Sequence, residues 1–188
     1  MREKLILTDC DGVLLHWEWS FDLWMAKHGY TRNDKTVYDM DINYDITRTE
    51  ASRLVKMFNE TVYINNLPPF ADAIRYVKLL HEHHGYIFHV ITSINSEPSV
   101  VEARVKNLHS VFGSSPFYRI TCVDDKRETL SEYKNSGCFW IEDHVKNYEL
   151  GLELGLTSIL MTQRYNTKYQ ADARVKNWAE LYRVITND

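Results

Sequence analysis

Two aspartates stand two positions apart where a short apolar run ends. Asp9 and Asp11 follow the run Leu5–Thr8, and Gly12 comes directly after them. Residues two apart on an extended chain point the same way, so both carboxylates lie on one side. Like charges about 4 Å apart repel by roughly 4 kcal/mol at an effective dielectric near 20, and a bound cation offsets that repulsion. Because magnesium prefers one or two carboxylates with water and substrate phosphate, the pair indicates magnesium-assisted chemistry on a phosphate.

Groups that suit a phosphate or a metal follow three further apolar runs. Thr92 and Ser93 offer hydroxyl donors, Lys126 offers a cation, and Glu142 with Asp143 forms a second acidic pair. Ligands of open parallel sheets bind at the carboxyl ends of the strands. We therefore expect all of these groups to meet the first aspartate pair in one crevice.

The elements that would position these groups alternate along the chain. Five apolar runs are typical of buried strands: Leu5–Thr8, Tyr86–Thr92, Tyr118–Val123, Cys138–Ile141 and Thr157–Met161. Apolar residues at helical spacing occur between or after them, in the sets Phe70/Ile74/Val77/Leu80, Val101/Val105/Leu108/Phe112, Val145/Tyr148/Leu152 and Val175/Trp178/Tyr182/Ile185. Strands that alternate with helices predict an α/β, Rossmann-like parallel sheet covered on both faces.

One stretch interrupts this alternation. Residues 17–67 hold no convincing strand and instead show two helical patterns, the second preceded by Thr47 and Glu50 at the spacing of a capping box. Pro68 and Pro69 mark the return to the sheet. We expect a core domain of residues 1–16 and 68–188, with residues 17–67 forming a small helical cap over the end of the first strand.

In order and position, these residues resemble the motifs of haloacid-dehalogenase-like hydrolases across nearly the whole chain. Asp9 to Gly12 match the first motif, an Asp-x-Asp-Gly after an apolar strand, and Thr92 matches the second. Lys126 matches the third, with Lys134 as a rival. The fourth motif, an acidic pair after a strand, is matched at residues 142–143, and the helical insertion is similar to the family's first type of cap.

The resemblance implies a role for each matched residue. Asp9 would be the nucleophile that forms an aspartyl-phosphate, and Asp11 would protonate the leaving oxygen and then activate water. Thr92, with Ser93 beside it, and Lys126 would hold the phosphoryl oxygens. The implied cofactor is Mg²⁺, bound by Asp9, the Asp11 backbone carbonyl and Asp143. Since a halide leaves without a proton, the acid at position 11 favours a phosphatase over a dehalogenase.

The fourth motif departs from the family's usual Asp-Asp. Its first member here is Glu142, whose longer side chain argues against direct metal ligation. We therefore assign the metal to Asp143 and expect Glu142 to support the ligands, with Asn147 one turn further on as another orienting group.

Softer similarities point to the 5′(3′)-deoxyribonucleotidases. They are the stretch 68–73, the Thr92-Ser93 end, the region 139–147, Tyr165-Asn166 and Trp178. The cap carries Trp17, Trp19, Phe21 and Trp24, which could stack on a base for about 1–3 kcal/mol each. The expected substrate is a nucleoside monophosphate. Other small phosphomonoesters, polynucleotide ends and a non-catalytic phosphate-binding scaffold are the alternatives.

Composition argues against several other classes of protein. A net charge of −4 lacks the strongly basic footprint of a general nucleic-acid binder. The sequence has no apolar run of the length that a transmembrane helix needs and shows no signal-peptide pattern. Three cysteines without a Cys-x-x-Cys pair fit reduced thiols, and we expect a cytoplasmic protein.

Overall fold

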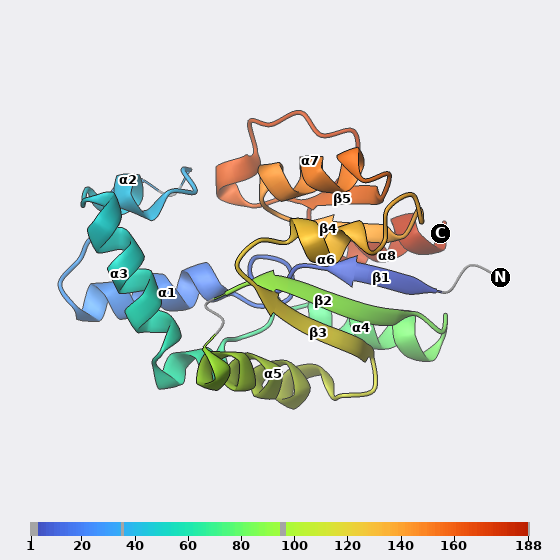
Figure 1. Ribbon diagram of the computed structural model, residues 1–188, viewed down its shortest axis with the longest axis horizontal. Coiled ribbons are helices and arrows are strands. Elements are labelled where there is room, and N and C mark those ends of the chain that lie inside the picture. The colour runs from blue at the N-terminus through green and yellow to red at the C-terminus, as the bar shows by residue number, and fades with distance from the viewer. Residues whose placement is uncertain (1–3, 35, 95–96, 188) are drawn as a thin grey trace.

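A six-stranded parallel sheet forms the centre of the molecule (Figure 1). The computed structural model describes residues 4–34, 36–94 and 97–187. The strand order is β3-β2-β1-β4-β5-β6, with bounds β1 Leu5–Thr8, β2 Ile87–Ser93, β3 Phe117–Val123, β4 Phe139–Glu142, β5 Thr157–Met161 and β6 Arg174–Val175. All five expected strands are confirmed to within one residue at each end, and so is the Rossmann-like α/β class.

The sixth strand differs from the expectation for the end of the chain. Val175 fits the apolar pattern of the last helix, but it pairs with Met161 in β6, and helix α8 begins only at Trp178. The side chain of Asn177 accepts a hydrogen bond from the Glu180 amide and fixes that start. A strand of two residues is too short to show an apolar run of its own, which is why the pattern points to the helix instead.

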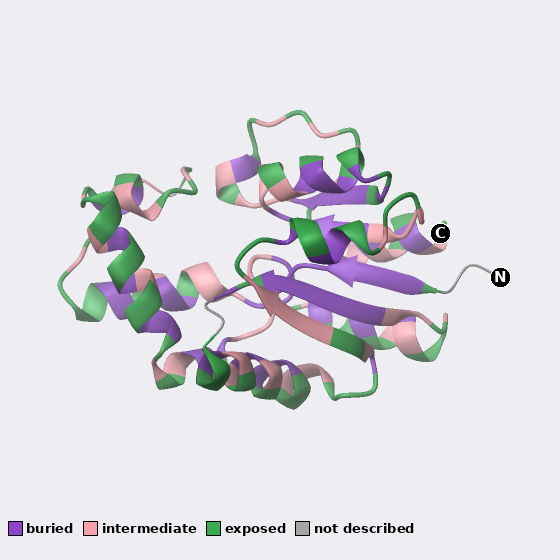
Figure 2. Ribbon diagram, viewed as in Figure 1, coloured by how far each residue is buried: buried purple, intermediate pink, exposed green. Residues whose placement is uncertain are grey.

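Helices cover both faces of the sheet. They are α4 Ala73–Glu82, α5 Pro98–Phe112, α6 Arg127–Ser131, α7 Val145–Glu153 and α8 Trp178–Thr186. Successive residues of β1 point to opposite faces: Ile6 joins the core beneath α4, α5 and α8, whereas Leu5 and Leu7 join the core beneath α6 and α7. Figure 2 shows the central strands buried and the edge strand β3 partly exposed.

Helix α5 buries a different face from the one that its apolar pattern indicates. The expected stripe contains Val101, Val105 and Phe112, which are only partly buried. The residues that α5 buries are Val100, Arg104, Asn107 and Leu108. The polar members of this set have partners inside the fold, so the helix turns them inward. The apolar pattern also predicts that Ile74 and Leu152 are buried, but each is 43 % exposed.

In the insertion at residues 17–67, the described residues form the helices α1 Trp17–Lys27, α2 Met40–Tyr44 and α3 Arg48–Asn59 and the 3₁₀ turn η1 Val62–Asn66, and none of them belongs to a strand. The Thr47 hydroxyl caps α3 by accepting the Glu50 amide at 3.2 Å, but the Glu50 carboxylate binds Arg53 and Tyr30, so only half of the capping box forms. Figure 1 shows the insertion beside the carboxyl ends of the strands.

The two segments that connect the insertion to the sheet lie side by side. Leu15 forms an antiparallel bridge with Pro69, and the His16 amide donates to the Pro68 carbonyl at 2.8 Å. The side chain of Asn107 on α5 accepts from the Leu67 amide at 3.1 Å and donates to the Leu67 carbonyl at 3.2 Å. The insertion is therefore anchored to the core where it begins and ends.

None of the helices in the described ranges combines the length and the apolar composition that a membrane crossing requires. The three cysteines are free.

Candidate active site

The strand ends bring every expected site residue to one cavity of about 520 Å³. Its walls include, from the core, Asp9, Asp11, Thr92, Ser93, Lys126 and Asp143. Asp9 follows β1, Thr92 lies near the end of β2, and Asp143 directly follows β4. The parallel sheet thus delivers groups that are distant in sequence to the same edge, as the carboxyl-end argument requires.

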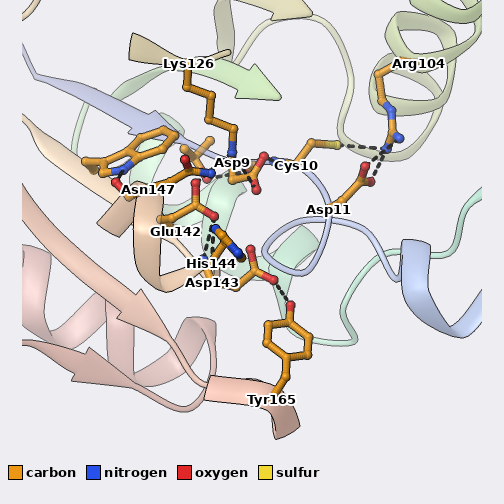
Figure 3. Close-up of polar contacts among 12 residues, drawn as sticks. Asp9, Cys10, Asp11, Arg104, Lys126, Glu142, Asp143, His144, Asn147 and Tyr165 are labelled. Carbon is orange, nitrogen blue, oxygen red and sulfur yellow. Dashed lines mark hydrogen bonds and ion pairs between the residues drawn. The ribbon is translucent and has the colours of Figure 1, made fainter. Parts of the chain in front are cut away.

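Lys126, immediately before α6, lies between two acids. Its Nζ is 2.9 Å from Asp9 Oδ2 and 2.7 Å from Glu142 Oε2 (Figure 3), and its side chain is almost fully buried. The rival Lys134 is exposed. The geometry therefore favours Lys126 as the lysine beside the phosphoryl position.

Glu142 has both carboxylate oxygens engaged. Oε2 pairs with Lys126, and Oε1 accepts the backbone amides of Asp143 and His144 at 3.0 and 2.9 Å. Glu142 thereby fixes both the lysine and the turn that carries Asp143. This arrangement supports the expectation that Glu142 orients the ligands rather than being one.

Burial and neighbouring charges shift the pKa values of the ionisable groups in the site. Burial, with the charge of Glu142, raises the pKa of Asp9 to about 8, and burial together with the Glu142 and Asp9 charges raises the pKa of Asp143. Burial alone would lower the pKa of Lys126, but the Asp9 and Glu142 charges outweigh it and raise that pKa. Carboxylate oxygens of Asp9, Glu142 and Asp143 lie within 4.8 Å of one another. Asp9 and Asp143 are hard oxygen donors whose ionisation needs a further positive charge, and such donors fit Mg²⁺.

Thr92 supplies a buried hydroxyl. The residue is fully buried, and among the described residues its Oγ1 makes no hydrogen bond. A buried hydroxyl without a partner is costly, by about 1–3 kcal/mol, unless a ligand satisfies it. Because Thr92 also lines the cavity, an oxygen of a bound phosphate is a suitable partner.

Asp11 is held by a residue that sequence reasoning does not identify. Arg104 on α5 is fully buried, and its Nη1 and Nη2 donate to Asp11 Oδ1 and Oδ2 at 2.5 and 2.8 Å. Figure 3 shows the Asp11 carboxylate turned toward Arg104 and away from Lys126. The sequence feature that could have identified Arg104 is its position one helical turn before Leu108, on the buried face of a core helix.

Gly12 makes room for the Asp143 carboxylate. Its φ is +79°, and a Cβ at this position would clash with Asp143 Oδ2. The same carboxylate oxygen accepts the hydroxyl of Tyr165, which lies in the turn η2 Arg164–Asn166 (Figure 3). Asn166 donates to the Asp143 carbonyl at 2.8 Å. Tyr165 and Asn166, which sequence alone marks only as a family similarity, thus position the acidic turn.

The cap contributes the outer wall of the cavity. Trp17 and Trp19 line it, and Trp19 is 56 % exposed. Phe21 and Trp24 do not line it: they are buried against Phe58 in the cap core. The expectation that these two could stack on a base is wrong, because one face of α1 has to pack against α3.

A charged network lies beside these aromatics. Arg32 pairs with Glu18 at 2.6 Å and with both oxygens of Asp22 at 2.9–3.0 Å, and all three line the cavity. Tyr38 reaches from the cap to the core, with its ring 4.3 Å from the His144 ring and 5.2 Å from that of Tyr165. The cavity is therefore enclosed by both parts of the chain.

The parallel sheet, the inserted helices and the acidic strand ends define a haloacid-dehalogenase-like hydrolase. More specifically, the model of the family described as "5' nucleotidase, deoxy (Pyrimidine), cytosolic type C protein" matches residues 3–187, and the chain belongs to this family. It is accordingly a phosphomonoester hydrolase. A comparison with curated protein sequences found no significant match.

Solved structures share the fold at low sequence identity. An archaeal β-phosphoglucomutase from Pyrococcus sp. strain ST 04 is similar with a TM-score of 0.64 at 16% identity, over 98% of this chain and 99% of that one. CbbY from Rhodobacter sphaeroides, in complex with phosphate, gives 0.61 at 17%, over 95% and 96%. The D,D-heptose 1,7-bisphosphate phosphatase from Burkholderia thailandensis gives 0.62 at 11%, over 99% and 100%.

Proposed function

We propose that this protein is a magnesium-dependent 5′-nucleotidase that hydrolyses (deoxy)nucleoside monophosphates through an aspartyl-phosphate on Asp9. The observation that carries the proposal is the buried Asp9–Lys126–Glu142 array beside Asp143 and the Thr92 hydroxyl, which has no hydrogen-bond partner among the described residues. This array offers a nucleophile, a cation and a hydroxyl donor around one phosphoryl position. We also propose a cytoplasmic location, in line with the family's description.

In the first step, an Asp9 oxygen attacks phosphorus, and the bond from phosphorus to the ester oxygen breaks. Protonated Asp11 gives its proton to that oxygen, so the nucleoside leaves as an alcohol. Lys126 and Thr92 hold the phosphoryl oxygens as negative charge moves onto them.

In the second step, the Asp11 carboxylate takes a proton from water, and the oxygen of that water attacks phosphorus. The bond between phosphorus and Asp9 breaks, which releases inorganic phosphate and restores both aspartates. Asp9, the Asp11 carbonyl and Asp143 would hold Mg²⁺, which offsets the repulsion between the anionic nucleophile and the anionic substrate when it is bound.

The cavity suits a substrate larger than a bare phosphate. Its volume of about 520 Å³ lies within the usual range for small-molecule sites. Trp17, Trp19 and Tyr38 offer aromatic faces at the cap side, whereas the phosphate groups lie at the sheet side. A nucleotide has the same polarity, with a flat base at one end and a phosphate at the other. In the proposal, the cap at residues 17–67 closes over the substrate and excludes water.

A phosphate-release screen tests the proposal. Wild-type protein and Asp9→Asn are assayed with Mg²⁺ and with EDTA on 5′-ribonucleotides, 5′-deoxyribonucleotides, sugar phosphates and p-nitrophenyl phosphate. We expect the highest kcat/KM on a nucleoside monophosphate, no turnover in EDTA, and no turnover by Asp9→Asn that is still folded. Faster turnover of sugar phosphates than of every nucleotide would refute the nucleotide assignment while leaving the phosphatase intact.

A further inference from the structure

The Asp11–Arg104 pair is at odds with the proton transfers assigned to Asp11. Both carboxylate oxygens accept hydrogen bonds from the one guanidinium, at 2.5 and 2.8 Å. In this orientation the Asp11 carboxylate faces Arg104 and is turned away from Lys126, so neither oxygen is directed at the leaving group (Figure 3). The side chain has to rotate before the acid can act.

Arg104 does not allow Asp11 to leave altogether. The guanidinium is fully buried, its Nε has no partner among the described residues, and its Nη1 also donates to the sulfur of Cys10 at 3.2 Å. Asp11 is the only carboxylate paired with Arg104 in the described part of the chain. Removal of the partner of a buried charge is strongly unfavourable.

One arrangement satisfies both constraints. One oxygen of Asp11 stays on Arg104 and the other turns toward the phosphoryl position. Asp9 does not compete for this cation, because its own partner is Lys126 at 2.9 Å. The two aspartates of the motif thus have separate cations, supplied from opposite sides of the strand end (Figure 3).

We infer that Arg104 is the positioning residue of Asp11, a pivot that holds one carboxylate oxygen while the other exchanges the proton with the leaving group. This inference rests on the proposed function, since it presumes that Asp11 is the acid. It assigns to helix α5 a direct part in the choice of leaving group.

Two substrates with different leaving groups separate positioning from general damage. The leaving group of a nucleoside 5′-monophosphate is an alkoxide, which needs a proton. The leaving group of p-nitrophenyl phosphate is a stabilised phenolate, which needs little help from an acid. We expect Arg104→Met to lower the ratio of kcat/KM for the nucleotide to kcat/KM for p-nitrophenyl phosphate by about tenfold or more. Arg104→Lys retains one cationic donor, and its ratio should stay within about threefold of wild type.

A matched control on the same helix is Leu108→Ala. Leu108 is fully buried, so the variant perturbs α5 without removing a donor to Asp11. We expect it to lower thermal stability and leave the substrate ratio unchanged. A fall in the ratio for Leu108→Ala equal to that for Arg104→Met would overturn the positioning role.

A double-mutant cycle tests whether Arg104 acts through Asp11, even if Arg104→Met folds poorly. With Asp11→Asn in the background, a change at Arg104 to Met or Lys should alter the ratio no further, because the residue acts through Asp11. An additive effect, or a higher ratio in Arg104→Met than in wild type, would contradict the pivot. If wild type hydrolyses neither substrate, the proposed function fails instead.

Discussion

At the scale of single residues, the site is a chain of alternating charges. Lys126 lies between Asp9 and Glu142, and Glu142 in turn holds the amides that fix Asp143. Each group is buried and depends on its neighbour for compensation. The same burial that makes the array costly to form keeps Asp9 beside its cation without water between them.

We expect Lys126→Met to lower kcat by about 10²–10³-fold, the usual effect of losing a donor to transition-state charge. The substitution also leaves two buried acids facing each other, so it should lower the melting temperature. The matched control is Lys134→Met, at the exposed position of the rival lysine. Phosphate-release kinetics with thermal unfolding would contradict the assignment if Lys134→Met were the more damaging change.

Gly12→Ala should reduce activity at least about tenfold, because the new Cβ would clash with the Asp143 carboxylate. Gly29→Ala is the control: Gly29 has a similar φ of +85°, but a Cβ added there would meet nothing within 4 Å. Both variants should lose about 1–2 kcal/mol to left-handed strain. Equal kcat values for the two variants would show that the space beside Asp143 has no part in the chemistry.

The residues that could be predicted are those whose chemistry is visible in one segment. Asp9, Thr92 and Asp143 each end an apolar run, so strand position and residue type suffice. Arg104 lies mid-helix among apolar residues, and nothing local says that its guanidinium meets Asp11, which is far away in sequence. The choice between Lys126 and Lys134 likewise depends on tertiary contacts.

At the scale of elements, strands β2 and β3 share a buried histidine. His89 on β2 bonds to Thr121 on β3 and to Tyr133, each at 2.7 Å. Burial and the nearby Arg119 lower the pKa of His89 from 6.5 to about 4, only partly offset by Glu132. The neutral ring is therefore built into the contact between these strands and the turn after α6.

Stability should depend on pH through this histidine. The folded pKa is below the unfolded value, so the folded state binds fewer protons, and the contribution is complete above pH 6.5 and lost as pH falls toward 4. Urea unfolding at pH 7 and pH 5 should show a larger loss for wild type than for His89→Gln, whose amide can still bond to both partners. Equal losses would rule out His89 as a source of the acid sensitivity.

Apolar patterns in the sequence predict some strands and helix faces correctly and miss others. Four- to seven-residue runs locate β1 to β5, because parallel strands that are covered by helices on both faces are largely apolar. Strand β6 is too short for such a pattern. The stripe on α5 fails because Arg104 and Asn107 are satisfied by Asp11 and by Leu67, and periodicity does not register polar residues with buried partners.

At the scale of the whole molecule, Mg²⁺ binding should couple to stability. Ions that bind only the folded chain raise its free energy of unfolding by about 2.7 kcal/mol at one hundred times Kd. We expect Mg²⁺ to raise the melting temperature of wild type and to have little effect on Asp143→Asn. Asp39→Asn, which changes an exposed acid at the rim of the same cavity, should respond like wild type. An identical response from Asp143→Asn would place the ion elsewhere.

The paired connections at Leu15–Pro69 and His16–Pro68 have an architectural consequence. Because the chain leaves and re-enters the sheet through neighbouring, mutually bonded segments, the ends of the insertion already meet. A lineage could lengthen, shorten or replace the helices between them by joining two adjacent points, without altering a single strand crossing. The helices of the insertion can therefore change during evolution without any change in the strand ends that carry the acidic residues.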